Sequence, residues 1–214
     1  MKKTTLFVCA MLIATLAIGA DEKYNQKMGE TLSEFSTCST VDDFQNLANK
    51  FRVIANVEKE EWLPLYYEAQ CYVQISFMGS LSAEEKDSYL DKASSVIEGM
   101  AELAPNEAEV QVMKALCYTG SLVVNPPQRA MNTTPLIHAA ITNALALEPN
   151  NPRAIFLRIS NEMGTASYFG NDVSPYCAQA AELLQNWDRY VLKSPIHPNW
   201  GKEDVEGIVN SCSK

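Results

Sequence analysis

The sequence predicts an all-α protein, built as a right-handed α-solenoid of antiparallel helix pairs, with about 3–4 repeats. Three observations predict this fold class. Apolar residues recur in trios at helical spacing, the trios repeat at a period near 45 residues, and no segment alternates apolar and polar residues over the length of a strand. The chain has 214 residues, 47% of them hydrophobic, which is enough to bury a core.

The apolar trios mark the second helix of each predicted pair. Ile137, Ile141 and Ala144 precede Pro149 by 12, 8 and 5 residues, so they share one helical face and the helix ends at the proline. The other copies are Ala93, Ile97 and Met100 before Pro105, Leu183, Trp187 and Tyr190 before Pro195, and Leu47, Phe51 and Ile54 before Lys59. Successive copies are separated by 46, 44 and 46 residues.

The first helix of each pair repeats as well. Residues 67–72 (YEAQCY) align with residues 113–118 (MKALCY) at an offset of 46, and residues 155–162 (IFLRISNE) follow at an offset of 44. We therefore expect three equivalent first helices. The helices expected along the chain are 22–35, 42–56, 61–78, 86–103, 107–120, 134–147, 152–164, 176–192 and 202–212.

The segment from Asn143 to Ala154, with the sequence NALALEPNNPRA, resembles the junction between two tetratricopeptide repeats. The resemblance covers roughly residues 41–195 and implies an architecture, not an activity. The period is longer than the 34 residues usual in that family, and the excess falls between the first and second helices. The chain also resembles small exported tetratricopeptide-like proteins of Bacteroidota, through the segments EWLPLYY (61–67), NPPQR (125–129) and SPIHPNWG (194–201).

One departure from the family pattern is electrostatic. Glu68, Lys114 and Arg158 stand where a core leucine is usual. Because equivalent positions of stacked helices are neighbours, a Glu68–Lys114 ion pair is one hypothesis, and three separately solvated side chains are the alternative.

The first 20 residues have the order of a secretory signal peptide. Met1, Lys2 and Lys3 precede an apolar run over 6–18, followed by the small residues Gly19 and Ala20. The run is too short to span a bilayer. We expect cleavage near Ala20, export to the periplasm or the medium without membrane insertion, and a single mature domain over 21–214. The alternative is a hydrophobic first helix of the domain.

The charge argues against polyanionic partners. The net charge is −9, and it becomes −11 when Lys2 and Lys3 leave with the leader. An acidic chain without a Lys/Arg run repels phosphate backbones and anionic lipid headgroups. Nucleic acid is therefore not an expected partner.

Cleavage would leave five cysteines, an odd number, so at least one stays unpaired. None forms a CxxC pair or adjoins a histidine, which argues against redox-enzyme, zinc and c-type haem sites. Cys177 begins one expected helix and Cys212 ends the last one. A Cys177–Cys212 disulfide would staple a C-terminal capping segment over about 196–214, in which Trp200 closes the stack.

The sequence contains few of the residue patterns that enzymes use. The only histidines, His138 and His197, lack the spacing to other ligands or nucleophiles that metal sites and triads use. No nucleophile elbow, zinc-protease motif or phosphate loop occurs. We therefore expect no catalytic residue, no cofactor and no metal ligand. A hydrolase with an unrecognised carboxylate site is the weakest alternative.

Two long connections between helices are the first places where we expect binding residues. Residues 121–133 contain Asn125-Pro126-Pro127-Gln128-Arg129, and residues 164–174 contain the pair Tyr168 and Phe169. Long loops on a rigid scaffold often carry function. A joint site of Arg129, Tyr168 and Phe169 is one prediction. In the alternative, the prolines stiffen an insertion and Phe169 fills the adjacent core.

The first helices of such stacks line a concave surface, which makes Tyr66, Arg158 and Asn161 groove candidates. The main functional prediction is an exported, non-catalytic protein that binds a protein or a peptide. The alternative is a soluble binder of a small ligand or glycan, using a pocket beneath the 121–133 and 164–174 loops.

Overall fold

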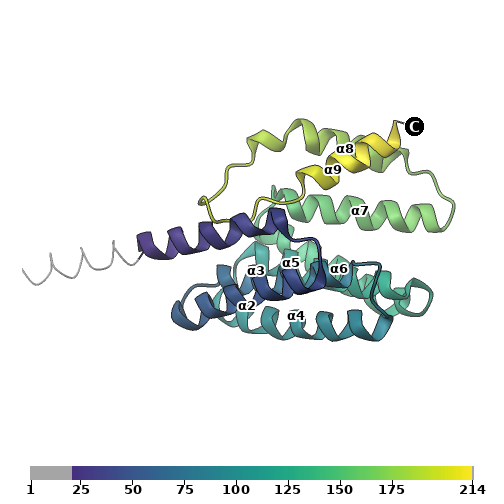
Figure 1. Ribbon diagram of the computed structural model, residues 1–214. Helices are drawn as coiled ribbons and strands as arrows, with labels where there is room; N and C mark the ends of the chain where they lie inside the picture. Colours follow the sequence, from purple (N-terminus) through teal and green to yellow (C-terminus); the bar gives the residue numbers. More distant parts are fainter. Residues whose placement is uncertain (1–20, 214) are drawn as a thin grey trace, which may run out of the picture.

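The computed structural model describes residues 21–213, and all the regular secondary structure in this range is helical (Figure 1). The expected signal peptide, residues 1–20, lies outside the described residues. A helix over 21–33 and a short 3₁₀ helix, Glu34–Thr37, come first. The α-helices that follow are α2 (Val41–Val57), α3 (Leu63–Ser76), α4 (Ala83–Leu103), α5 (Ala108–Val124), α6 (Pro126–Leu147), α7 (Pro152–Tyr168), α8 (Ser174–Gln185) and α9 (Lys202–Cys212).

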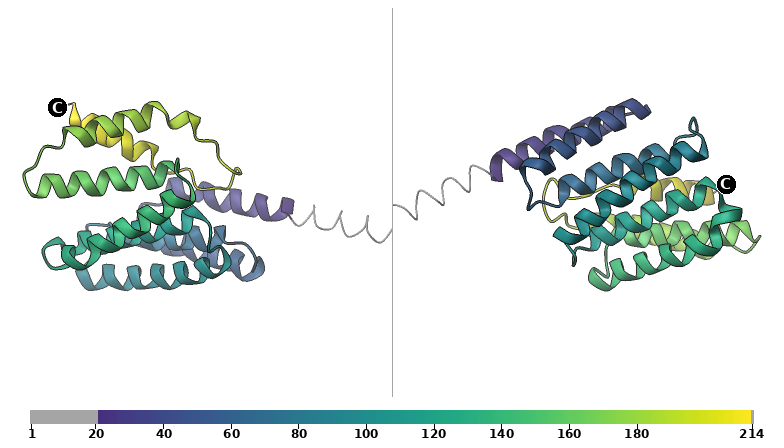
Figure 2. Two further views of the ribbon diagram at one scale, coloured as in Figure 1. Left: turned by 180° about the vertical axis from the view of Figure 1, so that it is seen from behind. Right: turned by 90° about the horizontal axis from the view of Figure 1, so that it is seen from below.

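Consecutive helices pack against each other along the chain. Successive first helices also contact each other, α3 with α5 and α5 with α7. Figure 2 shows this succession of neighbouring helices from below. The all-α class and the stacked helix pairs are thus confirmed. Kinship with tetratricopeptide repeats stays a prediction.

Side chains at the helix starts explain several boundaries. Thr40 and Ser82 each accept a hydrogen bond from the backbone N–H three residues on. The carboxylates of Asp43 and Glu85 accept from the backbone N–H of Thr40 and Ser82 in return, which completes two capping boxes. Asn151 caps α7 in the same way, by accepting from the N–H of Ala154.

The apolar trios fill the core as their spacing predicts. Phe51, Ile97 and Ile141 are all buried, and so are the other trio members on α2, α4 and α6. A second, smaller core joins α7, α8 and α9 around Ile159 and Leu183. The fold therefore has a main core under α2–α7 and a satellite core at its C-terminal end.

The expected 121–133 loop is wrong. Helix α5 continues to Val124 and α6 begins at Pro126, so only Asn125 separates the two helices. The two prolines occupy the first turn of α6, where the missing N–H costs nothing and the fixed φ suits a helix. The helix also continues through Pro135, which is on the exposed face, where water can satisfy the freed carbonyl.

Two other boundaries differ. Helix α7 reaches Tyr168, which shortens the expected 164–174 loop. The expected helix over 176–192 ends at Gln185, and Trp187–Arg189 form a 3₁₀ turn instead. Trp187 and Tyr190 still pack on the satellite core as half-buried side chains.

Residues 186–201 return from α8 across the first helices before α9 begins, and we name them the return segment (Figure 1). The Tyr67 hydroxyl donates to the carbonyl of Ile196 at 2.8 Å, and the Trp200 indole N–H donates to the Tyr66 hydroxyl at 2.8 Å. The end of the chain is thereby tied to α3, more than a hundred residues earlier.

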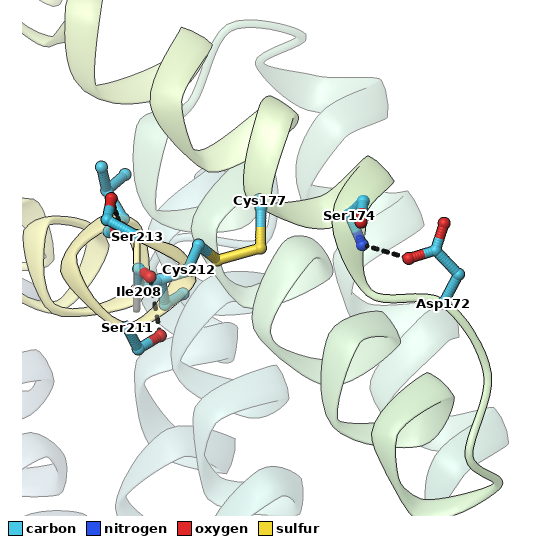
Figure 3. Close-up of a disulfide and its surroundings, with 8 residues drawn as sticks. Asp172, Ser174, Cys177, Ile208, Ser211, Cys212 and Ser213 are labelled. Atoms are coloured by element: carbon cyan, nitrogen blue, oxygen red, sulfur yellow. Dashed lines mark hydrogen bonds between the residues drawn. A yellow bond between two sulfur atoms is a disulfide. The ribbon is translucent and has the colours of Figure 1, made fainter.

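Helix α9 packs on α8, and a disulfide joins Cys177 to Cys212 across this contact, with the Cα atoms 5.9 Å apart (Figure 3). Asp172 accepts from the N–H of Ser174 at the start of α8. Cys38, Cys71 and Cys117 are free thiols. Among residues 21–213, no helix is both long and apolar enough to cross a membrane.

Candidate ligand-binding site

Two cavities lie on either side of Tyr190, where the return segment meets α7 and α8. The return-segment cavity has a volume of about 230 Å³ and is lined by Glu148, Asn150, Pro152, Arg153, Arg189, Tyr190, Val191, Leu192, Lys193 and His197. The α7–α8 cavity has a volume of about 190 Å³ and is lined by Ile155, Arg158, Ile159, Gln179, Glu182, Leu183, Asn186 and Tyr190. Tyr190 belongs to both, so the two cavities are adjacent.

A buried polar network stands behind the return-segment cavity. Arg153 donates to Glu109, with its Nη2 2.6 Å and its Nε 2.9 Å from Oε1. Asn151 and the Tyr66 hydroxyl donate to the same carboxylate, and Trp200 donates to Tyr66. The network fixes the junction of α5, α7 and the return segment.

Burial and charge shift the pKa values in this network. Burial disfavours the charged form of Arg153, but the adjacent Glu109 carboxylate outweighs it, and the pKa of the guanidinium is raised. Burial, reinforced by Glu109, raises the pKa of Tyr66 well above its ordinary value. Arg153 is therefore charged and Tyr66 neutral at physiological pH.

His197 also lines the return-segment cavity. Its side chain is buried, its ring meets the Trp62 ring edge-to-face at 5.8 Å, and its Nε2 atom has no hydrogen-bond partner among residues 21–213. Burial lowers the pKa of the imidazole, against the opposing effect of the Glu109 carboxylate. His197 is therefore neutral at physiological pH.

The two other basic residues of the return segment differ in their pairing. Lys193 bonds to Glu107 at 2.9 Å and lies 3.8 Å from Glu148. Burial opposes the charge on Lys193, yet the bond to Glu107 prevails and raises its pKa. The exposed side chain of Arg189 makes neither a hydrogen bond nor an ion pair within the described part of the chain.

The groove candidates from the sequence have different surroundings. Tyr66 is wholly buried in the polar network and offers no groove surface, because its helix packs against α5 and the return segment. Arg158 lines the α7–α8 cavity. Asn161 bonds to Thr119 of α5 and to the carbonyl of Leu157, so it joins α5 to α7.

The residues of the expected joint loop site are not linked to one another. Arg129 donates to both carboxylate oxygens of Asp87 on α4, at 2.6 and 2.7 Å, and no hydrogen bond joins it to Tyr168 or Phe169. The rings of Tyr168 and Phe169 contact each other edge-to-face at the end of α7, and both are about 70% exposed. Phe169 therefore does not fill the core. The two cavities beside Tyr190 lie under the return segment, not beneath the expected pair of loops.

The charged residues Glu68, Lys114 and Arg158 do not form the ion pair of the hypothesis. Glu68 accepts from Arg52 of α2 at 2.6 Å, and Arg52 also reaches the Tyr72 hydroxyl, so the Glu68–Lys114 pair is wrong. The ion pair between successive first helices is instead Glu109–Arg153. These residues are 44 positions apart, the repeat offset itself, and that spacing was the signal that sequence reasoning missed.

Two buried thiols and the acidic and histidine side chains bear on nucleophilic and metal chemistry. Burial raises the pKa of the Cys71 thiol and raises that of Cys117 to about 12, so neither is a thiolate nucleophile. No group of three His, Cys, Asp or Glu side chains within residues 21–213 is placed to hold a metal ion.

The fold and the cavities define a small all-α protein of stacked helix pairs with two adjacent cavities at its C-terminal end. The solved structure of the HusA haemophore from Porphyromonas gingivalis shares this fold, with a TM-score of 0.76 and 23% sequence identity over 88% of this chain and 92% of that chain. No protein-family model matches the sequence. A comparison with curated protein sequences gives no match either.

Proposed function

We propose that the protein is an exported, non-catalytic binding protein whose ligand is a planar tetrapyrrole such as haem. One observation carries the proposal: nearly the whole chain shares the fold of a haemophore. This favours the small-ligand alternative over the protein or peptide binding that was the main prediction. The site that we propose is the pair of cavities beside Tyr190, and not the pocket expected beneath the 121–133 and 164–174 loops.

The surface beside the cavities suits a flat apolar ring. Tyr190 is half-buried between the cavities, Val191 is 90% exposed and Leu192 is 41% exposed. All three residues line the return-segment cavity, and covering apolar surface is the main favourable term in binding a tetrapyrrole. Arg158 and Arg189 supply positive charge at the two cavities for the acidic groups of such a ligand.

The test is a titration of the mature chain, residues 21–214, with haemin. We expect a shifted Soret band, quenching of tryptophan fluorescence and a raised melting temperature. Val191→Asp places a charge on the proposed ring wall and should weaken binding by at least about tenfold. Val57→Asp is the matched control, because Val57 is similarly exposed at the end of α2. Haemin that leaves both the absorption spectrum and the melting temperature unchanged contradicts the proposal.

A second candidate function is supported by the exposed Tyr168–Phe169 pair. Two adjacent exposed aromatic rings are typical of protein-binding surfaces. The test is a pull-down from an envelope fraction with the natural chain and with a Tyr168→Ala/Phe169→Ala variant. A partner recovered equally by both rules out this surface.

A further inference from the structure

The return-segment cavity is rich in basic groups although the chain as a whole carries a net charge of −9. Arg153, Arg189, Lys193 and His197 line it, against the single carboxylate of Glu148. Carboxylates pair with Arg153 and Lys193, so Arg189 is the cation at this cavity that no carboxylate of the described residues compensates, and an uncompensated cation favours an anionic occupant.

The basic groups of the cavity differ in how far their bonding is already satisfied. Arg153 is held by Glu109, and Lys193 by Glu107 and Glu148. Arg189 has no partner among the described residues, and the Nε2 atom of His197, whose side chain is 6% exposed, is buried without one. A buried nitrogen without a partner is unfavourable unless a ligand or water bonds to it. The free bonding capacity of the cavity therefore lies on Arg189 and His197.

We infer that the return-segment cavity is a carboxylate subsite, in which the acidic arm of the ligand is held by Arg189 and by the Nε2–H tautomer of His197. The inference rests on the proposed function, because it assigns one end of the same ligand. A guanidinium and a carboxylate form paired, charge-assisted hydrogen bonds, and a neutral imidazole can donate one more. A volume of about 230 Å³ holds a carboxylate on a short aliphatic arm, while the ring stays against Tyr190, Val191 and Leu192.

The charges around His197 give the subsite a pH dependence. Glu109 and Glu107 favour the charged imidazole, Lys193 and Arg153 oppose it, and the Trp62 ring is neutral. A bound carboxylate adds a negative charge and so raises the pKa of His197. Binding then takes up a proton, and affinity rises as the pH falls toward and below the ordinary histidine pKa of 6.5.

The first experiment compares protoporphyrin IX with its dimethyl ester, which has the same ring and no free acid. The natural chain should bind the diacid at least about tenfold more tightly. Arg189→Gln should reduce this ratio toward one, whereas Lys92→Gln, which removes a charge from α4, should preserve it. Equal binding of diacid and ester overturns the inference and leaves the proposed function standing. A preference that survives Arg189→Gln also overturns it, since the acid group then binds elsewhere.

The second experiment does not require a tetrapyrrole. The imidazole resonances of His197 are followed by NMR while succinate is added, with the exposed His138 as an internal reference. Succinate should raise the pKa of His197, and the resonances of His138 should not respond to its addition. If no tetrapyrrole binds but succinate shifts His197, the proposed function fails and the carboxylate subsite stands. If succinate leaves His197 unchanged, the subsite is wrong.

Discussion

Glu109 and Arg153 occupy the second residue of α5 and of α7, and their side chains form a bidentate ion pair that is almost completely buried. The carboxylate also accepts from Asn151 and Tyr66. A buried pair of this kind holds two repeats in register, and each partner depends on the other to compensate its charge.

Removing one partner should therefore be costly. Glu109→Ala leaves Arg153 buried without its counter-ion, and we expect a loss of about 3–5 kcal/mol in the free energy of unfolding. Glu109→Leu combined with Arg153→Met should recover much of this loss. The measurement is denaturation by urea, with Arg129→Ala as the control, since its pair with Asp87 is partly exposed and its loss leaves no buried charge uncompensated. Equal losses for Glu109→Ala and Arg129→Ala contradict the prediction.

The buried imidazole of His197 should make stability depend on pH. Burial lowers its pKa in the folded state, so the unfolded chain takes up the proton first as the pH falls below about 6.5. His197 therefore lowers the free energy of unfolding progressively below that pH and has no such effect well above it. Melting temperatures measured at pH 7.5 and 5.5, in buffers without carboxylates, should fall less for His197→Asn than for the natural chain. The exposed residue provides the control, since His138→Asn should leave the slope unchanged.

Gly120 lies where α5 approaches α3 and α4 closely. A Cβ atom there would lie 2.9 Å from Leu90 Cδ2 and 3.0 Å from Ser76 Oγ. Gly120→Ala should therefore reduce the free energy of unfolding by about 1–3 kcal/mol. Gly99 is helical with open space around it, so Gly99→Ala should increase stability by about 0.5–1 kcal/mol. The two effects can be read from parallel urea curves, and the same sign in both variants would show that packing is not the cause at Gly120.

The Cys177–Cys212 disulfide should stabilise the docking of α9. It closes a loop of 35 residues, for which the chain-entropy estimate is about 3–4 kcal/mol. Cys177→Ser/Cys212→Ser should lower the melting temperature and increase amide exchange in α9 more than in α4. Cys38→Ser, which removes a free thiol, is the control. Unchanged exchange in α9 would mean that the packing of Val205 and its neighbours suffices without the bond.

Apolar spacing predicted most of the helices because each trio buries one face, and burial is insensitive to the exact helix ends. The Pro126–Pro127 pair misled the sequence reasoning, since the same residues break a helix interior and begin a helix. The expected helix over 176–192 is too long at its C-terminal end, because Trp187 and Tyr190 keep the apolar spacing after the helix has ended at Gln185.

The candidate site was harder to predict than the fold. Its cavities form only when the return segment folds back, and the contacts that hold it, Tyr67 to Ile196 and Tyr66 to Trp200, join residues 129 and 134 positions apart. Helical periodicity carries no information about such contacts. Arg158 was named for a concave groove and instead lines a cavity.

The same return segment changes how the molecule should unfold. In a linear array of repeats each unit touches only its neighbours, so the ends can unravel one unit at a time. Here the return segment, near the C-terminal end, is bonded to α3, near the beginning of the array. Loss of the C-terminal residues therefore removes support from the N-terminal half as well, and the stack should melt in one cooperative transition.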